Sequence, residues 1–582
     1  MGIGHYIRPV ERPFTRAERE RVTCLFGGLT ARHDALILAA FRGLGYRGAR
    51  IPTPTKADFQ TGKEYCNPGM CNPAYFTVGA LVNYLKRLRD DAGLSTEAVL
   101  RDYAFVTAGS SGPCRFGMYE SEFRLGLRNS GFDGFRVLAF QQKGGVRQSN
   151  QTCGLTIDGE FAVTLLTSLM LGDLLNDTAN RIRPYERIPG QTDRVFGRVL
   201  DRLRDRLCAW GHRSSRPGIP ARLVASMAPG MTPGQVQKVL RQLLGAYFTT
   251  ALEECAALIN EEIEVDYTRP KPICKVIGEF WAQMTEGDGN FNMFSFLETQ
   301  GAEAHAPTIM TWANYLLDVA QCTLMDEKGR AEHPGPRTCG AFVSRARQRL
   351  ARQKRLAGLA LIAKTLNREY ERMRLALGGL AHPQLAPAEL RRLANPYFDY
   401  RIAGGEGYLE VAKTIYYSMN HLAHMILSLK PFGCLPSTQS DGAQAAVRAR
   451  YPDINFVPVE TSGDGDINAY SRVLMALGDA KTRCKDEFEA CLKRTGYSLD
   501  TIRRFCQEHR ELRRPLQQVP RSDGVVGRAA NFVLHVASVM DANPAWERLK
   551  HAGPDRGRIR AGVSTSAAGY VQIWSDSEES VS

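Results

Sequence analysis

The chain has 582 residues, of which 43% are hydrophobic and 23% charged, and its formal net charge is +14. This length exceeds the size at which one hydrophobic core keeps growing, so we expect two or three domains. The longest apolar run, Phe161 to Leu171, is broken by two threonines and a serine and is too short to span a bilayer. The first 21 residues are polar and arginine-rich rather than a secretory leader. These features predict a cytoplasmic protein without a membrane partner.

The positive charge raises the question of nucleic-acid binding. The arginines, however, are scattered through predicted helical segments together with carboxylates, and no recognition motif accompanies them. We therefore expect no nucleic-acid partner and interpret the charge as a solvated basic surface that suits an acidic protein partner.

Residues 1–195 are predicted to form an N-terminal α/β lobe. A strand at 21–26, a helix at 34–44 and a strand at 46–51 open it. The segment 61–73, with two Asn-Pro pairs and two glycines, predicts a compact loop that holds Cys66 and Cys71. Cys71 directly precedes a helix at about 74–89, where backbone amides and the helix dipole favour a thiolate.

The same lobe contains a strand, loop and helix around Cys114. An apolar segment at 103–108 enters a Gly/Ser/Pro turn, and helical spacing begins after the cysteine. Ligands of open α/β sheets bind beyond the carboxyl ends of the strands, so Cys114 is expected at the mouth of a cleft. The alternative is a buried cysteine that acts as a small hydrophobe.

The remainder of the chain predicts three further regions. A strand at 135–140 and a long helix complete the first lobe, and on that helix Asp173, Asn176, Asp177 and Arg181 are interpreted as a solvated or subunit-contacting face. A helical connector is expected at 196–267, a second α/β lobe at 268–480, and a helical extension with a disordered acidic tail at 481–582. Gly404-Gly-Glu-Gly lacks the lysine and hydroxyl residue of a phosphate-binding loop.

The second lobe repeats the arrangement seen at Cys114. A strand at 424–430 runs into Pro431-Phe-Gly-Cys434-Leu-Pro, and a helix and a strand at 454–459 follow. Two facing lobes would bring Cys114, Cys434 and the Cys66/Cys71 loop round one cleft. Several thiols, few histidines and an intracellular setting favour an iron–sulfur cluster over zinc or a nucleophilic cysteine. Structural cysteines and a zinc site remain as alternatives.

Several motifs resemble those of the 2-hydroxyacyl-CoA dehydratase and activase-related family, which includes relatives of benzoyl-CoA reductase and of the double-cubane cluster proteins. They are Thr61-Gly-Lys-Glu, Cys71-Asn-Pro, Tyr75-Phe-Thr-Val-Gly, Ala108-Gly-Ser-Ser-Gly-Pro-Cys-Arg-Phe-Gly-Met-Tyr-Glu, Gly172-Asp-Leu-Leu-Asn-Asp, Arg183-Pro-Tyr-Glu and Pro431-Phe-Gly-Cys-Leu-Pro. The resemblance covers about residues 20 to 480.

The resemblance implies two Rossmann-like lobes that hold a cluster of the 4Fe-4S type or larger. It makes Cys71, Cys114 and Cys434 the ligand candidates. Cys66 lies one residue away from the position at which related dehydratase components have a cysteine after Gly-Lys-Glu. Ser111 occupies a position at which some relatives have a cysteine. The implied function is an electron-transfer or reductase component that receives low-potential electrons from a separate ATPase carrying its own 4Fe-4S cluster and reduces a small molecule. A metal-binding scaffold or maturation protein is the alternative, and a homodimer is a further expectation.

Overall fold

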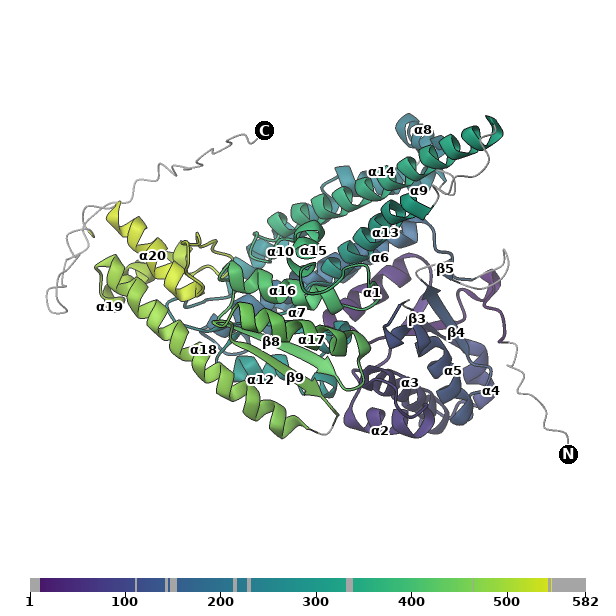
Figure 1. The fold of residues 1–582 in the computed structure, drawn as a ribbon, viewed down its shortest axis with the longest axis horizontal. Coiled ribbons are helices and arrows are strands. Elements are labelled where there is room, and N and C mark those ends of the chain that lie inside the picture. The colour runs from purple at the N-terminus through teal and green to yellow at the C-terminus, as the bar shows by residue number, and fades with distance from the viewer. Residues whose placement is uncertain are drawn as a thin grey trace.

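A computed structural model describes residues 11–546, apart from 110–111, 142–144, 147–153, 213–216, 228–231, 331–338, 464 and 543–545. In it the chain forms two α/β lobes, each built on a mainly parallel sheet (Figure 1). This confirms the predicted α/β class and its two sheets. The acidic tail lies outside the described residues.

The first lobe contains a five-stranded sheet in the order β2-β1-β3-β4-β5. The first four strands are parallel, and only β5 runs antiparallel to its neighbour β4. The strand bounds are β1 (Thr23–Phe26), β2 (Arg47–Arg50), β3 (Tyr103–Ala108), β4 (Arg136–Gln141) and β5 (Gly145–Val146). The helices of this lobe are α1 (Ala31–Gly43), α2 (Lys56–Tyr65), α3 (Asn72–Asp90), α4 (Thr96–Asp102) and α5 (Tyr119–Asn129).

The second lobe contains a parallel four-stranded sheet in the order β7-β6-β8-β9. Its strands are β6 (Ile273–Gly278), β7 (Glu303–His305), β8 (Met425–Pro431) and β9 (Phe456–Thr461). Every residue of β6, β7 and β8 is buried, which is typical of a parallel sheet covered on both faces. Its helices include α11 (Phe280–Met284), α12 (Met293–Thr299), α16 (Gly407–Met419), α17 (Leu435–Arg450) and α18 (Asp466–Thr495).

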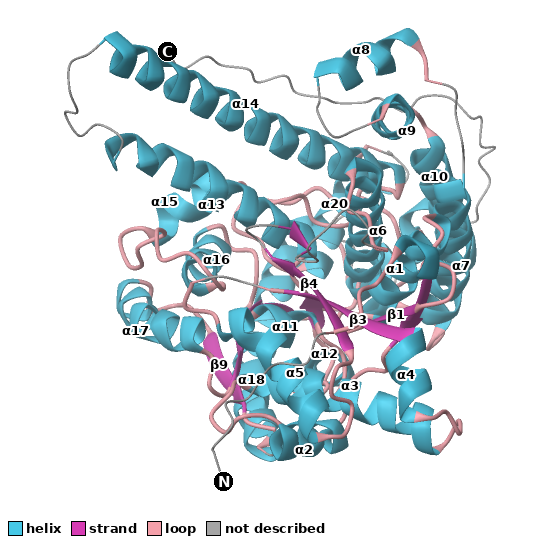
Figure 2. Ribbon diagram, turned by 90° about the vertical axis from the view of Figure 1, so that its right-hand side faces the viewer, coloured by secondary structure: helices cyan, strands magenta, loops and turns pink. Residues whose placement is uncertain are grey.

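Helices join the two lobes and extend beyond them. They are α6 (Gly159–Ile182), α7 (Gln191–His212), α8 (Ile219–Met227), α9 (Pro233–Leu244), α10 (Tyr247–Glu262), α13 (Ile309–Arg330), α14 (Cys339–Ala376), α15 (Pro387–Ala394), α19 (Leu499–Glu508) and α20 (Arg528–Asp541). Figure 2 shows α13 and α14 projecting side by side from the body. None of the helices in the described residues is long and apolar enough to cross a membrane.

Two local predictions are wrong. The segment 61–65 belongs to α2 rather than to a loop, because Thr55 and Asp58 cap a helix that starts upstream. The polar face of α6 is buried rather than solvated: Asp173 and Asp177 are 2% and 3% exposed. The carboxylate of Asp173 accepts the backbone N–H groups of Ile309 and Met310 and so caps α13. These polar residues therefore fix helices to one another inside the molecule.

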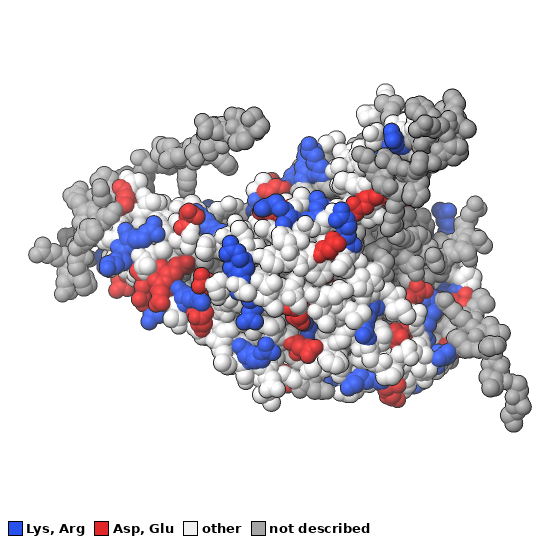
Figure 3. Space-filling view, in the orientation of Figure 1, with Lys and Arg blue, Asp and Glu red and all other residues white. Residues whose placement is uncertain are grey.

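The surface charge is mixed. On the face shown in Figure 3, cationic and acidic side chains are interspersed rather than gathered into one basic patch.

Candidate functional site

A cavity of about 520 Å³ lies where the strands of the two lobes end. Its wall includes Gly27 and Gly28 after β1, Thr107 at the end of β3, and Glu279 after β6. The loop that follows β8 completes it with Cys434. The cavity therefore occupies the position at which open α/β sheets bind ligands, and here two sheets contribute to one site.

Cys71, Cys114 and Cys434 all line this cavity. Each cysteine is the residue directly before a helix: Cys71 precedes α3, Cys434 precedes α17, and Cys114 precedes the short 3₁₀ helix η2 (Arg115–Met118). The positive end of a helix dipole stabilises negative charge on a thiol. The sequence thus brings three thiols to one cavity from two lobes, as the motif parallel predicts.

Close approaches between loops hold the three cysteines together. The backbone N–H of Asn72, next to Cys71, donates to the carbonyl of Phe432 at 3.1 Å. Gly433 has a φ of +78° and lies so close that a Cβ there would be 3.2 Å from the Cα of Cys71. A Cβ on Gly405 would be 3.4 Å from the Cβ of Cys114 and 2.4 Å from Pro436. Only glycine allows these loops to meet.

The thiols of Cys71 and Cys434 are buried, that of Cys114 is half-buried, and they have few polar partners. Burial raises the pKa of Cys114 to about 12 and also raises the pKa of Cys71 and of Cys434. Two hydroxyls oppose this rise: Tyr119 lies 3.1 Å from the sulfur of Cys71, and Ser437 donates to the sulfur of Cys434 at 3.1 Å. No histidine is present among the lining residues that the structure describes, so the cavity lacks the base of a nucleophilic cysteine.

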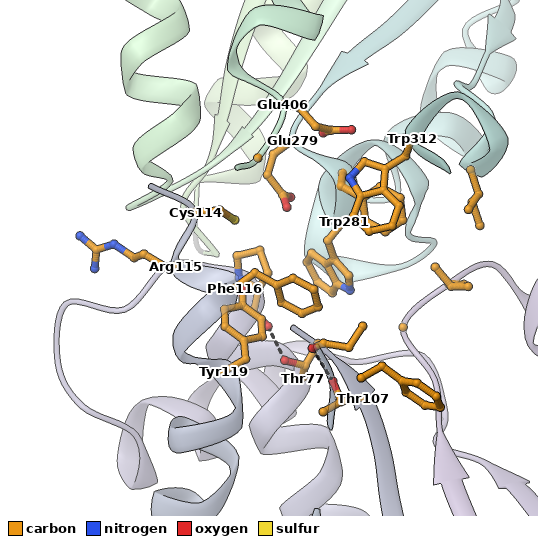
Figure 4. A pocket seen from close by; sticks show the side chains of 18 of the residues that line it. Thr77, Thr107, Cys114, Arg115, Phe116, Tyr119, Glu279, Trp281, Trp312 and Glu406 are labelled. Atoms are coloured by element: carbon orange, nitrogen blue, oxygen red, sulfur yellow. Dashed lines mark hydrogen bonds between the residues drawn. The ribbon is translucent and has the colours of Figure 1, made fainter. Parts of the chain in front are cut away.

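Two carboxyl groups of the second lobe lie near the thiols. In Figure 4 the carboxyl of Glu279 lies between Cys114 and Trp281, with Glu406 close by. Burial raises the pKa of Glu279 and raises that of Glu406 to about 8. The amide of Gln283 donates to both oxygens of Glu406, at 3.0 and 2.9 Å. Both carboxyl groups therefore bind protons more tightly than an exposed glutamate does.

Cys66 does not line the cavity. It ends α2 and packs in the first-lobe core, where burial raises its pKa to about 12. The twelve cysteines that the structure describes are all free thiols, and Ser111 lies outside the described residues. Across the described part of the chain, no three His, Cys, Asp or Glu side chains are grouped so that they would hold a metal ion.

Sequence reasoning missed the carboxylates and the aromatic partners of the thiols. Glu406 stands in a glycine-rich segment weighed only as a phosphate loop, and Glu279 directly follows a predicted strand. The strand-end position was an available signal for Glu279. Tyr119 lies inside the motif quoted around Cys114, but nothing in the sequence places its hydroxyl beside the sulfur of Cys71.

A second cavity, of about 350 Å³, adjoins the first and has a charged wall that includes Arg32, Arg183 and Glu298. Gln283 belongs to this wall and bonds Glu406 in the wall of the first cavity. Gln283 thus connects the walls of the two cavities.

The chain was compared with protein-family models, with curated proteins and with solved structures. None of these comparisons finds a match, so its function is argued from the geometry of the cavity and from the motifs.

Proposed function

We propose that the protein is an iron–sulfur electron-transfer component that accepts low-potential electrons from a separate ATP-hydrolysing activator and reduces a small molecule in the cavity. The observation that carries this proposal is the convergence of Cys71, Cys114 and Cys434, from two lobes, on the wall of one cavity. The motif resemblance to 2-hydroxyacyl-CoA dehydratase components points to the same three residues.

The donor set suits an iron–sulfur cluster. Thiolates are the usual ligands of such clusters, and the cavity offers three of them with no histidine among its described lining residues. Cys71, Cys114 and Cys434 would hold such a cluster at the cavity wall. Cys66 remains the fourth candidate of the resemblance, although it packs behind the wall. When bound, the cluster would supply single electrons at low potential.

The residues around the thiols support that chemistry. The hydroxyls of Tyr119 and Ser437 bond sulfurs, and such bonds stabilise ligand charge and set the potential. Burial raises the pKa of Glu279 and of Glu406, and a reduction that adds electrons to a substrate also needs protons.

Elemental analysis of anaerobically purified protein tests the proposal. We expect iron and acid-labile sulfide in comparable amounts, and an electron paramagnetic resonance signal after reduction at low potential. Stoichiometric zinc without iron after anaerobic reconstitution would refute it. Incubation with an iron-free acceptor protein separates a reductase, which keeps its cluster, from a scaffold, which transfers it.

A further inference from the structure

Helix α14 carries a run of positive charge without acids of its own. Residues 339–368 include eight lysines and arginines and no aspartate or glutamate. The basic helix α7 differs, because acids match its cations: Arg198 pairs with Glu262, and Arg204 pairs with Asp201 at 2.8 Å. Figure 2 shows α14 projecting from the body of the molecule beside α13. The positive charge of α14 is therefore presented to solvent or to a partner.

Seven exposed residues of α14 form one stripe along the helix. Their spacing alternates between three and four residues, which keeps side chains on one face of a helix. They are Arg347, Leu350, Lys354, Ala357, Leu361, Lys364 and Arg368. Within the described part of the chain, none of the four cations in this set is in an ion pair. We call the seven residues the α14 stripe.

The opposite side of α14 is already covered. Leu356, Leu359 and Leu366 lie about half a turn away from the α14 stripe and are half-buried, and Leu366 packs against the main hydrophobic core. Apart from Gly358, every residue of 345–361 is a strong helix former, so the helix is present before any partner binds. A partner therefore lies alongside α14 and does not enclose it.

The composition of the α14 stripe selects the kind of partner. Leu350 and Leu361 are 53% and 66% exposed between cations, so a partner that covers them must bury hydrocarbon as well as offer negative charge. A nucleic-acid backbone supplies the charge but does not cover leucine side chains. A membrane surface favours a wide apolar face with aromatic residues, and the stripe has neither. A second copy of α14 would bring the same positive charge.

We propose that the α14 stripe docks an acidic, amphipathic α-helix of another protein. Two helices that pack side by side match the alternation of three and four residues. Glutamates of the partner would pair with the cations of the stripe, while its leucines would cover Leu350 and Leu361. The stripe is about 32 Å long at 1.5 Å per residue, which is about six turns of a partner helix. The proposal does not depend on the function of the thiol cavity.

Binding of a designed peptide to the full-length protein tests the proposal. The probe is a fluorescent peptide of about 21 residues that repeats the heptad Leu-Glu-Ala-Leu-Glu-Glu-Ala. A scrambled peptide has the same composition and charge but no helical spacing of its leucines. We expect the probe to bind at least about tenfold more tightly than the scrambled peptide, and to weaken about tenfold between about 0.1 and 0.5 M salt. Equal affinity for the two peptides would overturn the proposal.

Charge reversals locate the binding surface. Lys354→Glu combined with Lys364→Glu should weaken the probe at least about tenfold, because two attractive contacts become repulsive. Lys481→Glu combined with Lys485→Glu changes the net charge equally at exposed positions of α18 and should alter the affinity less than about twofold. Equal effects of the two double variants would show that the probe responds to net charge and not to α14, which would overturn the proposal.

Removal of leucines tests the apolar part of the contact. Leu350→Ala combined with Leu361→Ala keeps every charge and should weaken the probe about fivefold, because less hydrocarbon is buried. Leu474→Ala, at a position of α18 that is 42% exposed, should leave the affinity unchanged. All these positions are exposed, and circular dichroism checks that each variant is folded. Unchanged affinity in the Leu350/Leu361 variant would show that charge acts alone and would overturn the assignment to an amphipathic helix.

Competition separates a protein helix from the two other anionic partners. Duplex DNA of about 20 base pairs and vesicles containing phosphatidylserine are added to the complex of protein and probe. Neither should displace the probe better than the scrambled peptide does at the same concentration of negative charge. Stronger displacement by DNA would assign the α14 stripe to nucleic acid, and stronger displacement by vesicles would assign it to a membrane surface. Either result would overturn the proposal.

Discussion

Two regions of the molecule bury ionisable side chains and give them opposite properties. The first is the cavity wall, with Glu279 and Glu406. The second, which we call the β7 network, consists of Glu303 and His305 of β7 with Asp177, His382 and Arg528. In the β7 network Glu303 contacts Arg528 at 3.0 Å, His305 at 2.8 Å and the hydroxyl of Tyr185 at 2.8 Å.

Charged partners decide the direction of the pKa shift. Burial by itself would raise the pKa of Glu303, but Arg528 and His305 hold it well below its usual range. Asp177 likewise has a lowered pKa, because the hydrogen bond of the His382 ring and the charge of Arg181 outweigh burial. On the cavity wall, burial raises the pKa of Glu279 and of Glu406. Paired buried charges are typical of structure, whereas unpaired titratable groups at a cavity are typical of function.

The largest expected effect separates cavity thiols from core thiols. Serine at Cys114 or Cys434 should remove most of the iron and the activity, because a hard oxygen replaces a soft thiolate ligand. Serine at Cys71 should do the same. Cys491 lies on α18 and is 3% exposed in the hydrophobic core. Serine there should keep the iron and cost only about 1 kcal/mol of stability.

Serine at Cys484 or Cys506 should have the same effect as serine at Cys491. Serine at Cys66 tests whether this thiol, which does not line the cavity, is also a ligand. Iron content, sulfide content and the absorption spectrum are the measurements. If the Cys114 and Cys434 variants kept a full cluster, the cavity thiols would have to be reassigned as packing.

A second prediction compares the two kinds of buried carboxylate. Glu303→Gln leaves Arg528 buried without its counter-charge and should lower the free energy of unfolding by about 3–5 kcal/mol. Glu279→Gln keeps a side-chain oxygen that can accept the N–H of Ala282, so it should cost less than about 1 kcal/mol. Urea denaturation of both variants measures the difference. Equal destabilisation would mean that charge pairing does not distinguish the two regions.

A third prediction tests the contact between loops without removing a thiol. Gly405→Ala places a Cβ 2.4 Å from Pro436 at a φ of +81°, and should lower stability by about 1–3 kcal/mol and weaken iron retention. Gly442→Ala lies in α17 with no atom within 4 Å of its Cβ, and should stabilise the helix by about 0.5–1 kcal/mol. Thermal unfolding and iron content are measured for both. Equal behaviour would show that the Gly405 loop does not support the site.

The sequence predicted the parts of this molecule that depend on local pattern. The strands ending before Cys114 and Cys434 lie within a few residues of their predicted positions, because runs of buried β-forming residues bounded by Gly/Pro turns specify them locally. Strand β7 was missed, since three residues give no periodicity. The burial of Asp173 and Asp177 was missed because a polar helix face has the same pattern whether water or another helix covers it. The contact between Gly433 and Cys71 was missed as well, because it joins residues that are far apart in the chain.

The last prediction concerns Lys275, which lies between the two regions. Its ammonium is buried in β6, donates to the carbonyl of Ala306 at 3.0 Å and lies 5.0 Å from the centre of the Tyr417 ring. In the described residues no carboxylate is within ion-pair distance of it. Its pKa is lowered to about 7: burial is the largest cause, Asp177 opposes it, and Lys413 and Arg181 add to it.

The folded-state pKa of Lys275 lies below the unfolded value of 10.5, so the unfolded chain binds the proton more tightly. The contribution of Lys275 to stability should therefore rise as pH increases from about 7 toward 10.5. Between pH 7 and 9 this contribution should change by about 2 kcal/mol. Lys275→Met removes this contribution, so the difference in unfolding free energy between the parent and Lys275→Met should change with pH in that direction. Lys485→Met, at a position 70% exposed, should show no such change. A difference independent of pH would mean that Lys275 stays charged in the folded protein and that the β7 network extends to it.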